Sequence, residues 1–435
     1  MIENLGGSAP VGAGRHILLL QGPNGGFFRR LQVGLEKQGA RATRVALNGG
    51  DLVDAGLGRR VIFSRSLAEW PEWLEHFASA NGVTDVVLYG DCRPYHKAAI
   101  ATLKPRGIRI HVLEEGYLRP DWITCETDGV NGNSLFAGLD LSAIDQKELD
   151  SKKVPPSRRY GPWQRQYIMA GFWYYFWCTV LGLAFPRYVT HRELGVVSEA
   201  ILWLRRFLAW PLRWRRTGRT LARLREIDAP LHLVFLQLTA DSQIREHSRF
   251  SSTLEFVKYC IAEFAAADTG DAILVFKNHP LDNGLVNLRK VVEEEAKEAG
   301  VADHVFFIDT GKNVPVLQRA TSVIAVNSTA CHQGLARNIP TLVLGHAVYN
   351  HPEIVPRMRL ADFFRLRPVG DAAAYERLVR LLRITCQING NFYSMRGKDA
   401  VLPELCRKVL AGGPQLADFV TPGLALERQK RSLRQ

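Results

Sequence analysis

The stretch HILLLQGPNGGFFRRLQVGLEKQGARATRVALNGGD, from His16 to Asp51, decides the fold. Its apolar opening predicts a buried strand, and the glycines that follow predict a tight turn. Phe28, Leu31 and Leu35 then recur at helical spacing, and a glycine ends the predicted helix before a second apolar strand. A strand, a helix and a second strand in this order form a βαβ unit, so the sequence predicts a parallel sheet.

The same alternation continues along the chain. Apolar runs at residues 84–91 and 109–120 predict two more strands, and a second series of strands and helices follows Pro230. Two Rossmann-like α/β domains that face a cleft are the arrangement of GT-B glycosyltransferases, so we expect a GT-B-like α/β fold. The expected divisions are an N-terminal domain at residues 1–160, an apolar and basic helical segment at 161–228, a second Rossmann-like domain at 229–385 and a helical tail at 386–435.

The composition indicates an anionic partner and a reducing compartment. The chain of 435 residues has a formal net charge of +13, which favours nucleic acid, an anionic membrane surface or a phosphorylated substrate. Its seven cysteines include no CxxC pair, which argues against a disulfide framework or a zinc site. We find no apolar signal-peptide core near the N-terminus, so we expect a cytoplasmic protein.

Two segments between the predicted domains differ from them. YIMAGFWYYFWCTVLGLAF, residues 167–185, is uncharged and strongly aromatic. It suits a membrane span, a buried helix or a helix lying in a membrane surface. ILWLRRFLAWPLRWRRTGRTLARLRE, residues 201–226, interleaves eight arginines with Trp203, Trp210 and Trp214. Arginine and tryptophan together favour attachment to anionic lipid, although a solvated helix face or RNA binding would use the same residue types.

Polar residues follow the predicted strands, where ligands bind in parallel α/β sheets. QGPNGGFF, residues 21–28, is a glycine turn ahead of a helix, which suits either an anion or a turn without a ligand. EEGYLRP places Glu114, Glu115 and Arg119 at a strand end. They suit either an acid/base pair in a cleft or a solvated ion pair.

The second predicted domain has polar strand ends of the same kind. FKNHP places Lys277 and His279 together, and a lysine with an imidazole suits a phosphate. VNSTA, residues 326–330, places hydroxyl side chains where they cap a helix or help to bind phosphate. In TADSQ, Asp241 either caps a short helix at residues 242–247 or takes part in chemistry.

In chain order, several strings resemble the capsule polysaccharide biosynthesis family, most closely its KpsS/LipB-type members. They are LLLQGPNGGFF, NGGD, EEGYLRPDWIT, GVNGNS, LQLTADSQIREHS, KNHP, VNSTA, GHAVYNHPEI and INGNFY, which lie between residues 16 and 397. The resemblance implies a retaining β-Kdo transferase of GT-B form from Gram-negative bacteria. The implied donor is CMP-Kdo, and the implied acceptor is a phosphatidylglycerol-type lipid, or its lyso form, that anchors the capsule.

The resemblance also implies roles for individual residues. Retention implies two displacements, with Asp241 as the nucleophile and Glu115 as the acid/base for the acceptor hydroxyl. The implied donor-binding residues are Lys277, His279, Asn327, Ser328, Thr329, Gln237 and Ser242. The residues implied to face the cleft from the N-terminal domain are Gln21, Gly22 and Arg119. No metal or other cofactor is implied, because the sequence has no DxD motif and no His/Cys cluster.

The implied partners are CMP-Kdo, the lipid acceptor, an anionic membrane surface and the capsule biosynthesis and export proteins, without nucleic acid. We therefore expect a peripheral enzyme on the inner face of the inner membrane. Three alternatives stay open: a later Kdo transfer, the transfer of another CMP-activated nonulosonate such as sialic acid, and a non-catalytic adaptor of the capsule assembly and export complex.

Overall fold

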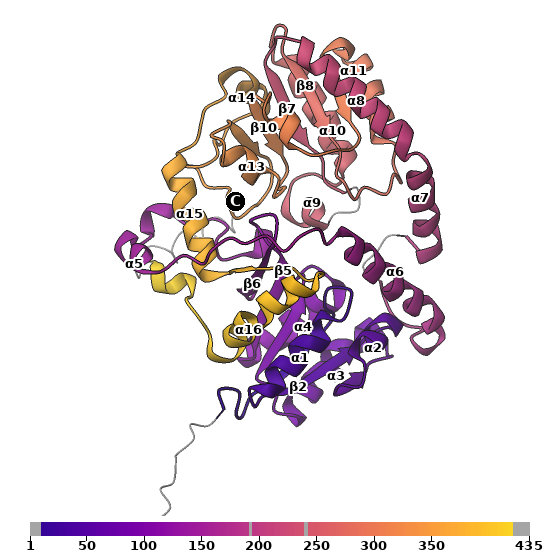
Figure 1. The fold of residues 1–435 in the computed structure, drawn as a ribbon, viewed down its shortest axis with the longest axis vertical. Helices are drawn as coiled ribbons and strands as arrows, with labels where there is room; N and C mark the ends of the chain where they lie inside the picture. Colours follow the sequence, from indigo (N-terminus) through magenta and orange to yellow (C-terminus); the bar gives the residue numbers. More distant parts are fainter. Residues whose placement is uncertain (1–9, 191–193, 239–241, 421–435) are drawn as a thin grey trace, which may run out of the picture. The chain divides into compact units, whose positions relative to one another are not determined.

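The described part of the chain folds into two compact units, each built on one β-sheet (Figure 1). The computed structural model describes residues 10–190, 194–238 and 242–420, with only the backbone of residues 242 and 243. Of these, the first unit contains residues 10–134, 147–190 and 381–419, and the second unit contains residues 135–146, 194–238, 242–380 and 420.

The first unit is built on a seven-stranded sheet. Its strands are β1 (His16–Leu19), β2 (Arg41–Ala46), β3 (Arg60–Ile62), β4 (Asp85–Tyr89), β5 (Arg109–Glu115), β6 (Trp122–Thr127) and β12 (Gln387–Asn389). Strands β1 to β5 are parallel in the spatial order β3-β2-β1-β4-β5, which is the Rossmann order. Strand β6 runs antiparallel to β5, and β12 runs antiparallel to β6. The predicted parallel sheet is therefore present, with an antiparallel extension at one edge.

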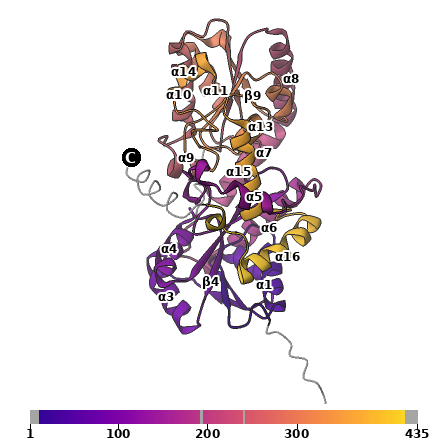
Figure 2. The ribbon, with the colours of Figure 1, turned by 90° about the vertical axis from the view of Figure 1, so that its left-hand side faces the viewer.

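Helices cover both faces of this sheet. The helices of this unit are α1 (Phe27–Lys37), α2 (Gly49–Ala55), α3 (Trp70–Ala80), α4 (Pro94–Leu103), α6 (Gln164–Val180) and α16 (Met395–Ala411). Two further helices lie where the chain passes between the units: α5 (Gln146–Ser151) and α15 (Ala372–Thr385). Successive residues of β1 point to opposite faces. Ile17 and Leu19 pack with α1 and α16, whereas Leu18 and Leu20 pack with α3 and α4. Figure 2 shows α1 and α16 on one side of the sheet and α3 and α4 on the other.

The second unit has a five-stranded sheet in which all strands are parallel. They are β7 (Leu231–Phe235), β8 (Ile273–Lys277), β9 (Val305–Ile308), β10 (Ser322–Ala325) and β11 (Thr341–Val343). Their spatial order, β9-β8-β7-β10-β11, repeats the Rossmann order of the first unit. The prediction of a GT-B-like α/β fold with two Rossmann-like units is confirmed.

The helices of the second unit begin with the arginine-rich segment. They are α7 (Val196–Leu208), α8 (Trp210–Glu226), α9 (Ser242–His247), α10 (Thr253–Ala266), α11 (Leu288–Glu298), α12 (Val314–Leu317), α13 (Cys331–Leu335) and α14 (Leu360–Leu366). Residues of α10, α11 and α14 form one apolar core with β7, β8 and β10. Helix α8 contacts β9.

The C-terminal region returns to the first unit. Strand β12 pairs with β6, and α16 packs against α1 so closely that a Cβ on Gly34 would lie 2.8 Å from Sγ of Cys406. The sequence pattern predicts a mostly helical tail here, and it does not predict β12. Three residues are too few for alternation of polar and apolar side chains to indicate a strand.

The uncharged aromatic segment forms α6, which packs against α2 of the first unit. A Cβ on Gly49 would lie 2.3 Å from the carbonyl oxygen of Trp177, so the glycines of NGGD allow the two backbones to approach. Only Tyr174 of α6 is buried, so the buried helix, one of the three alternatives for this segment, does not fit. Among the helices of the described residues, none is both long enough and apolar enough to span a membrane.

Candidate functional site

Two side chains meet at the switch point of the second sheet, where the strand order reverses between β7 and β10. Gln237 follows β7 by two residues, and Asn327 follows β10 by two residues. The Gln237 amide donates to Oδ1 of Asn327 at 2.8 Å, and the Asn327 backbone N–H donates to Oε1 of Gln237 at 3.2 Å. Open α/β sheets bind their ligands at this point, so the two predicted donor-binding residues lie where the topology favours a ligand.

Two hydroxyl residues, Ser328 and Thr329, lie between the end of β10 and the start of α13. The Ser328 Oγ accepts the backbone N–H of Ala330 at 3.2 Å, and the Ser328 carbonyl accepts the hydroxyl of the buried Tyr349 at 2.5 Å. The Thr329 carbonyl accepts the backbone N–H of His332 at 3.2 Å. Ser328 and Thr329 are therefore held by backbone hydrogen bonds next to Asn327.

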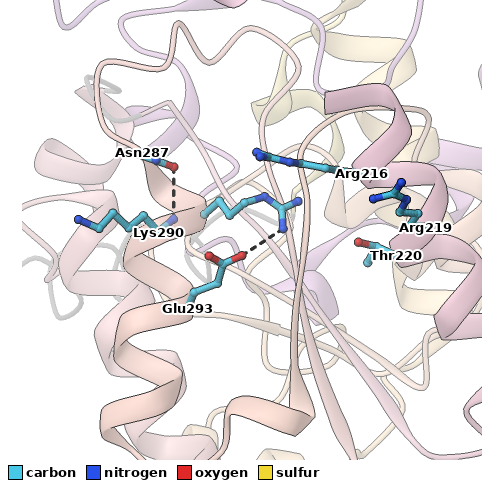
Figure 3. Close-up of a pocket in the computed structure, with 7 residues that line it drawn as sticks. Arg216, Arg219, Thr220, Asn287, Lys290 and Glu293 are labelled. Atoms are coloured by element: carbon cyan, nitrogen blue, oxygen red, sulfur yellow. Dashed lines mark hydrogen bonds and ion pairs between the residues drawn. The ribbon is translucent and has the colours of Figure 1, made fainter. Parts of the chain in front are cut away.

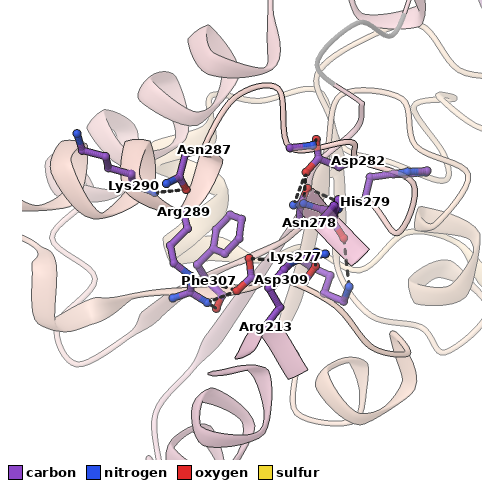
Figure 4. Close-up of polar contacts among 12 residues, drawn as sticks. Arg213, Lys277, Asn278, His279, Asp282, Asn287, Arg289, Lys290, Phe307 and Asp309 are labelled. Carbon is purple, nitrogen blue, oxygen red and sulfur yellow. Dashed lines mark hydrogen bonds and ion pairs between the residues drawn. The ribbon is translucent and has the colours of Figure 1, made fainter. Parts of the chain in front are cut away.

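Lys277 ends β8, the strand beside β7 (Figure 4). Only 1% of its surface is exposed, and its Nζ donates to the carbonyl of Asn278 at 3.1 Å. Burial lowers the pKa of this ammonium group to about 8, the carboxylate of Asp309 opposes that shift, and the guanidinium groups of Arg213 and Arg206 add to it. The lysine is therefore a cation close to its titration point, held beside further cations.

Two arginines of the arginine-rich segment turn toward this end of the sheet. Arg206 of α7 pairs with Asp282 at 3.1 Å, and Arg213 of α8 donates to the carbonyl of Asp309 at 3.1 Å. Burial lowers the pKa of both guanidinium groups. Asp309 also pairs with Arg289 at 2.6 Å (Figure 4). Asp282 and Asp309 therefore hold two arginines of the segment that the sequence assigns to lipid contact.

The ring of His279 is oriented by the turn after β8. Its Nδ1 accepts the backbone N–H of Leu281 at 3.1 Å, and its own backbone N–H donates to Oδ1 of Asn278 at 2.8 Å. Because Nδ1 is an acceptor, the neutral ring carries its proton on Nε2. Nε2 is therefore the nitrogen that can donate to a phosphate oxygen.

The predicted nucleophile, Asp241, lies outside the described residues. Helix α9 follows it at Ser242–His247, as the sequence predicts for a short helix at this place. Ser242 opens this helix, and its side chain is also outside the described part of the chain.

In the first unit, Glu115 ends β5 with two partners. Its carboxylate accepts the hydroxyl of Tyr393 at 2.8 Å through one oxygen and pairs with Arg119 at 3.1 Å through the other. Tyr393 comes from the INGNFY string and stacks on Trp163 with ring centroids 5.2 Å apart. Glu115 and Arg119 therefore meet, as an ion pair bordered by aromatic rings.

Glu114 precedes Glu115 in β5 and is a second acid at this strand end. Burial is the largest cause that raises its pKa, to about 7, and the nearby carboxylate of Glu115 adds to the shift. The backbone N–H of Glu115 donates to its Oε1 at 2.9 Å and opposes the shift. Near neutral pH both the protonated and the charged form of this carboxyl are therefore populated.

This raised pKa predicts a pH-dependent stability. Between the ordinary pKa of 4.5 and about 7, the folded chain holds a proton that the unfolded chain has released, so stability falls as pH rises across this window. We expect Glu114→Gln to raise the free energy of unfolding by about 2 kcal/mol above pH ~7 and to have little effect below pH ~4. Urea unfolding across pH tests this, with the exposed Glu72→Gln as control. Equal gains at low and high pH would contradict it.

Gln21 and Gly22 follow β1 and face the interior of the first unit. The Gln21 amide donates to Asp51 at 2.9 Å and to the hydroxyls of Tyr174 and Tyr188 at 3.3 and 3.1 Å. A Cβ on Gly22 would lie 2.7 Å from the ring of Phe28. The polar side chain of Gln21 thus helps to anchor α6, and Gly22 allows close packing of an aromatic ring.

In the glycine turn that suits an anion, the carboxylate of Asp54 from the same chain takes that place. The backbone N–H groups of Gly25 and Gly26 point to a carboxylate oxygen of Asp54 at 3.2 and 3.4 Å. These bonds lower the pKa of Asp54, but the larger effect of burial raises it above the ordinary value. The turn therefore satisfies its donors internally.

Two residues that border the predicted site residues have no role assigned from the sequence. Tyr393 contacts Glu115 from a segment 278 residues later in the chain, and only its place in the INGNFY string could have indicated it. Arg213 adds to the positive potential at Lys277, and no signal separates it from the other seven arginines of its segment.

Comparison with known proteins identifies the family. The family model described as "Capsule polysaccharide biosynthesis protein" matches residues 84–393. The capsule polysaccharide export protein KpsS of Escherichia coli is 30% identical over 382 residues, which cover 88% of this chain and 97% of that protein. The capsule polysaccharide modification protein LipB of Neisseria meningitidis serogroup B is 29% identical over 389 residues, covering 87% and 92%.

Among solved structures, the β-Kdo 2,7 transferase KpsC of Thermosulfurimonas dismutans is similar, with a TM-score of 0.41 and 12% identity over 91% of this chain and 99% of that chain. The match of the family model over most of the chain, and the near full-length match to KpsS, are the decisive results. The chain belongs to the capsule polysaccharide biosynthesis protein family.

Proposed function

We propose that the chain is a retaining β-Kdo glycosyltransferase. It transfers Kdo from CMP-Kdo to a phosphatidylglycerol-type lipid, or its lyso form, in the synthesis of the capsule polysaccharide linker. The observation that carries the proposal is the polar cluster at the switch point of the second unit, where Gln237 and Asn327 bond to each other beside the strand that ends in Lys277. Membership of the capsule family supports it.

The cluster suits the phosphate of a CMP-sugar. When the bond to the sugar breaks, negative charge develops on the leaving CMP phosphate. The ammonium group of Lys277 and the Nε2–H of His279 are donors of the kind that offset such a charge. Arg213 and Arg206 raise the local positive potential further, so departure of CMP becomes easier.

In the proposed mechanism of two displacements, Asp241 and Glu115 have the roles that the resemblance implies. The carboxylate of Asp241 attacks the anomeric carbon, and CMP leaves with the bonding electrons. An acceptor hydroxyl then displaces Asp241 from the anomeric carbon and gives its proton to Glu115. The hydrogen bonds of Glu115 to Tyr393 and Arg119 support this role, since they fix the orientation of its carboxylate.

A lipid acceptor requires contact with a membrane surface. Helix α6 exposes Ile168, Met169, Phe172, Trp173, Phe176 and Val180, each between 40% and 61%. These side chains recur at helical spacing on the face opposite Tyr174. Helices α7 and α8 expose Trp203, Trp210 and Trp214 among their arginines. We therefore propose a peripheral protein whose α6 and Arg/Trp segment lie in the interface of the inner face of the inner membrane.

We also propose that transfer needs no metal ion. Cationic side chains next to Lys277 can supply the charge that a metal would otherwise supply. In the part of the chain that the structure describes, no three His, Cys, Asp or Glu side chains are placed to hold a metal ion. Chelation by EDTA should then leave the transfer rate unchanged.

Release of CMP from competing donors tests the proposal. We expect the purified protein to release CMP from CMP-Kdo when vesicles contain phosphatidylglycerol, and to do so equally well in EDTA. Faster release from CMP-sialic acid would favour transfer of another nonulosonate. Release that requires a Kdo-primed acceptor would favour a later Kdo transfer. A folded protein that releases CMP from none of these mixtures would favour the adaptor of the assembly and export complex.

A further inference from the structure

A basic pocket lies between α8 and the start of α11 in the second unit (Figure 3). Its volume is about 530 Å³. Helix α8 contributes Arg216, Arg219 and Thr220, and Arg216 reaches toward the start of α11 (Figure 3). The other wall consists of Asn287, Arg289, Lys290 and Glu293. The lining thus contains four cations and one acid.

The cations of the α11 wall have partners within the protein. Arg289 pairs with Asp309 at 2.6 Å and with Glu293 at 3.3 Å, and Lys290 lies 3.4 Å from Glu294. Within the described residues, Arg216 and Arg219 of α8 have no hydrogen-bond or ion-pair partner. Two unpaired guanidinium groups on one pocket wall repel each other unless an anion joins them. The unsatisfied charge of the pocket therefore lies on α8.

The chemistry of the lining indicates a phosphate group. Guanidinium groups bind phosphate oxygens through paired N–H donors, with a geometry that matches a phosphate better than a chloride ion. Asn287 and Thr220 add polar atoms at the edge. Among the described residues, no aromatic side chain lines the pocket, so a base or a sugar would find no ring to stack on. The pocket is suited to a ligand that is recognised by its phosphate.

Exposed apolar side chains on α8 and at the end of α7 favour a lipid as the source of this phosphate. Leu212 lies one helical turn before Arg216 on the same face of α8, and it is 52% exposed. Phe207 and Leu208, at the end of α7, are 75% and 70% exposed. A soluble phosphate would have no use for exposed apolar side chains here, whereas a phospholipid would place its acyl chains against them.

We propose that the pocket between α8 and α11 binds the phosphate of an anionic phospholipid headgroup and so attaches the second unit to a membrane surface. The pocket shares no lining residue with the predicted donor residues, although its Arg289 pairs with Asp309, which acts on Lys277. The proposal does not rest on glycosyl transfer. Attachment can be measured without any sugar donor. Failure of this proposal and failure of the transferase proposal are therefore distinguishable.

Cosedimentation of the full chain with vesicles tests the proposal. The vesicles contain either equal parts of phosphatidylglycerol and phosphatidylcholine, or phosphatidylcholine alone. We expect wild type to bind the anionic vesicles, Arg216→Gln with Arg219→Gln to weaken that binding about tenfold, and Arg216→Glu with Arg219→Glu to weaken it further. Both arginines are exposed, so we expect unchanged thermal unfolding in both variants.

A matched control separates the pocket from the general positive charge of the surface. Arg225→Glu with Lys297→Glu changes the charge of α8 and α11 by the same amount as the glutamate pair, at exposed residues outside the pocket. We expect this control to weaken binding less than about threefold. An equal loss in the control and the pocket variant would overturn the proposal.

Inorganic phosphate distinguishes a lipid from a soluble ligand. We expect phosphate, compared with chloride at equal ionic strength, to raise the unfolding temperature of wild type more than that of the glutamine variant, because the pocket recognises the phosphate group. If phosphate stabilises wild type alone while both proteins bind anionic vesicles equally, the pocket takes a soluble phosphate compound, and the lipid assignment is wrong.

Discussion

Replacing Asp241 with asparagine is expected to lower kcat for Kdo transfer by about 10⁴-fold, while CMP-Kdo binding changes less than about threefold. Asparagine has nearly the same shape as aspartate, but its amide cannot attack the anomeric carbon. The loss should therefore appear in the chemical step and not in donor binding. Rates of CMP release and calorimetric titration with CMP-Kdo measure the two effects.

The matched control for Asp241→Asn is Asp271→Asn, which makes the same change at an exposed residue of the second unit. We expect it to retain wild-type activity. Rapid quenching of wild type should also yield intact protein that carries one Kdo, whereas Asp241→Asn should carry none. If Asp241→Asn keeps a tenth or more of the wild-type rate, Asp241 is not the nucleophile, and a cap of α9 becomes the better interpretation of this residue.

Replacing Lys277 with methionine is expected to lower kcat/KM by about 10²–10³-fold, because a charge that faces the leaving phosphate is lost. The variant should fold. Burial lowers the pKa of Lys277 to about 8, so at neutral pH the folded chain carries the cost of a buried charge. Methionine has a similar length without the charge, so we expect a free energy of unfolding at least equal to that of wild type. Urea unfolding and steady-state kinetics measure the two effects separately.

The same group gives wild type a distinct pH dependence. The ammonium form exists below a pKa of about 8, so kcat/KM should fall as pH rises through that value. Between about 8 and the ordinary value of 10.5 the unfolded chain binds the proton and the folded chain does not, so stability rises with pH in this window. Lys277→Met should lose both effects. A rate that stays constant well above pH ~9 would contradict a role for the Lys277 charge.

The sequence predicts much of the fold because both units use local signals. Apolar strands, glycine turns and helices at 3.6-residue spacing alternate in the order that a parallel sheet needs. Strand β12 gives no such signal, since Gln387–Asn389 is short and its partner β6 lies far away in the chain. The docking of α6 on Gly49 and Gly50 also depends on a distant contact, although the NGGD string marks the place.

The candidate site is predictable to the extent that strand ends define it. Gln237 and Asn327 follow neighbouring parallel strands, and that topology brings them together. Lys277 ends the next strand, β8, beside β7. The residues that contact or charge the predicted site residues are not predictable in this way. Tyr393 reaches Glu115, and Arg213 approaches Lys277, through pairings that no periodicity encodes.

The interior position of Gln21 has a related cause. Its partners Asp51 and Tyr174 come from separate elements, and the Tyr174 hydroxyl donates to Asp51 at 2.8 Å. A glutamine at a strand end could equally face a ligand, so the sequence alone does not distinguish an anchor for α6 from a binding residue.

The mass of the lipid product tests the central claim most directly. Purified wild-type protein is incubated with CMP-Kdo and phosphatidylglycerol, and the lipid is analysed by mass spectrometry. We expect phosphatidylglycerol to gain the mass of one Kdo residue, with an equal amount of CMP released. A folded protein that leaves both phosphatidylglycerol and a Kdo-primed lipid unchanged would contradict the claim that this chain is a Kdo transferase.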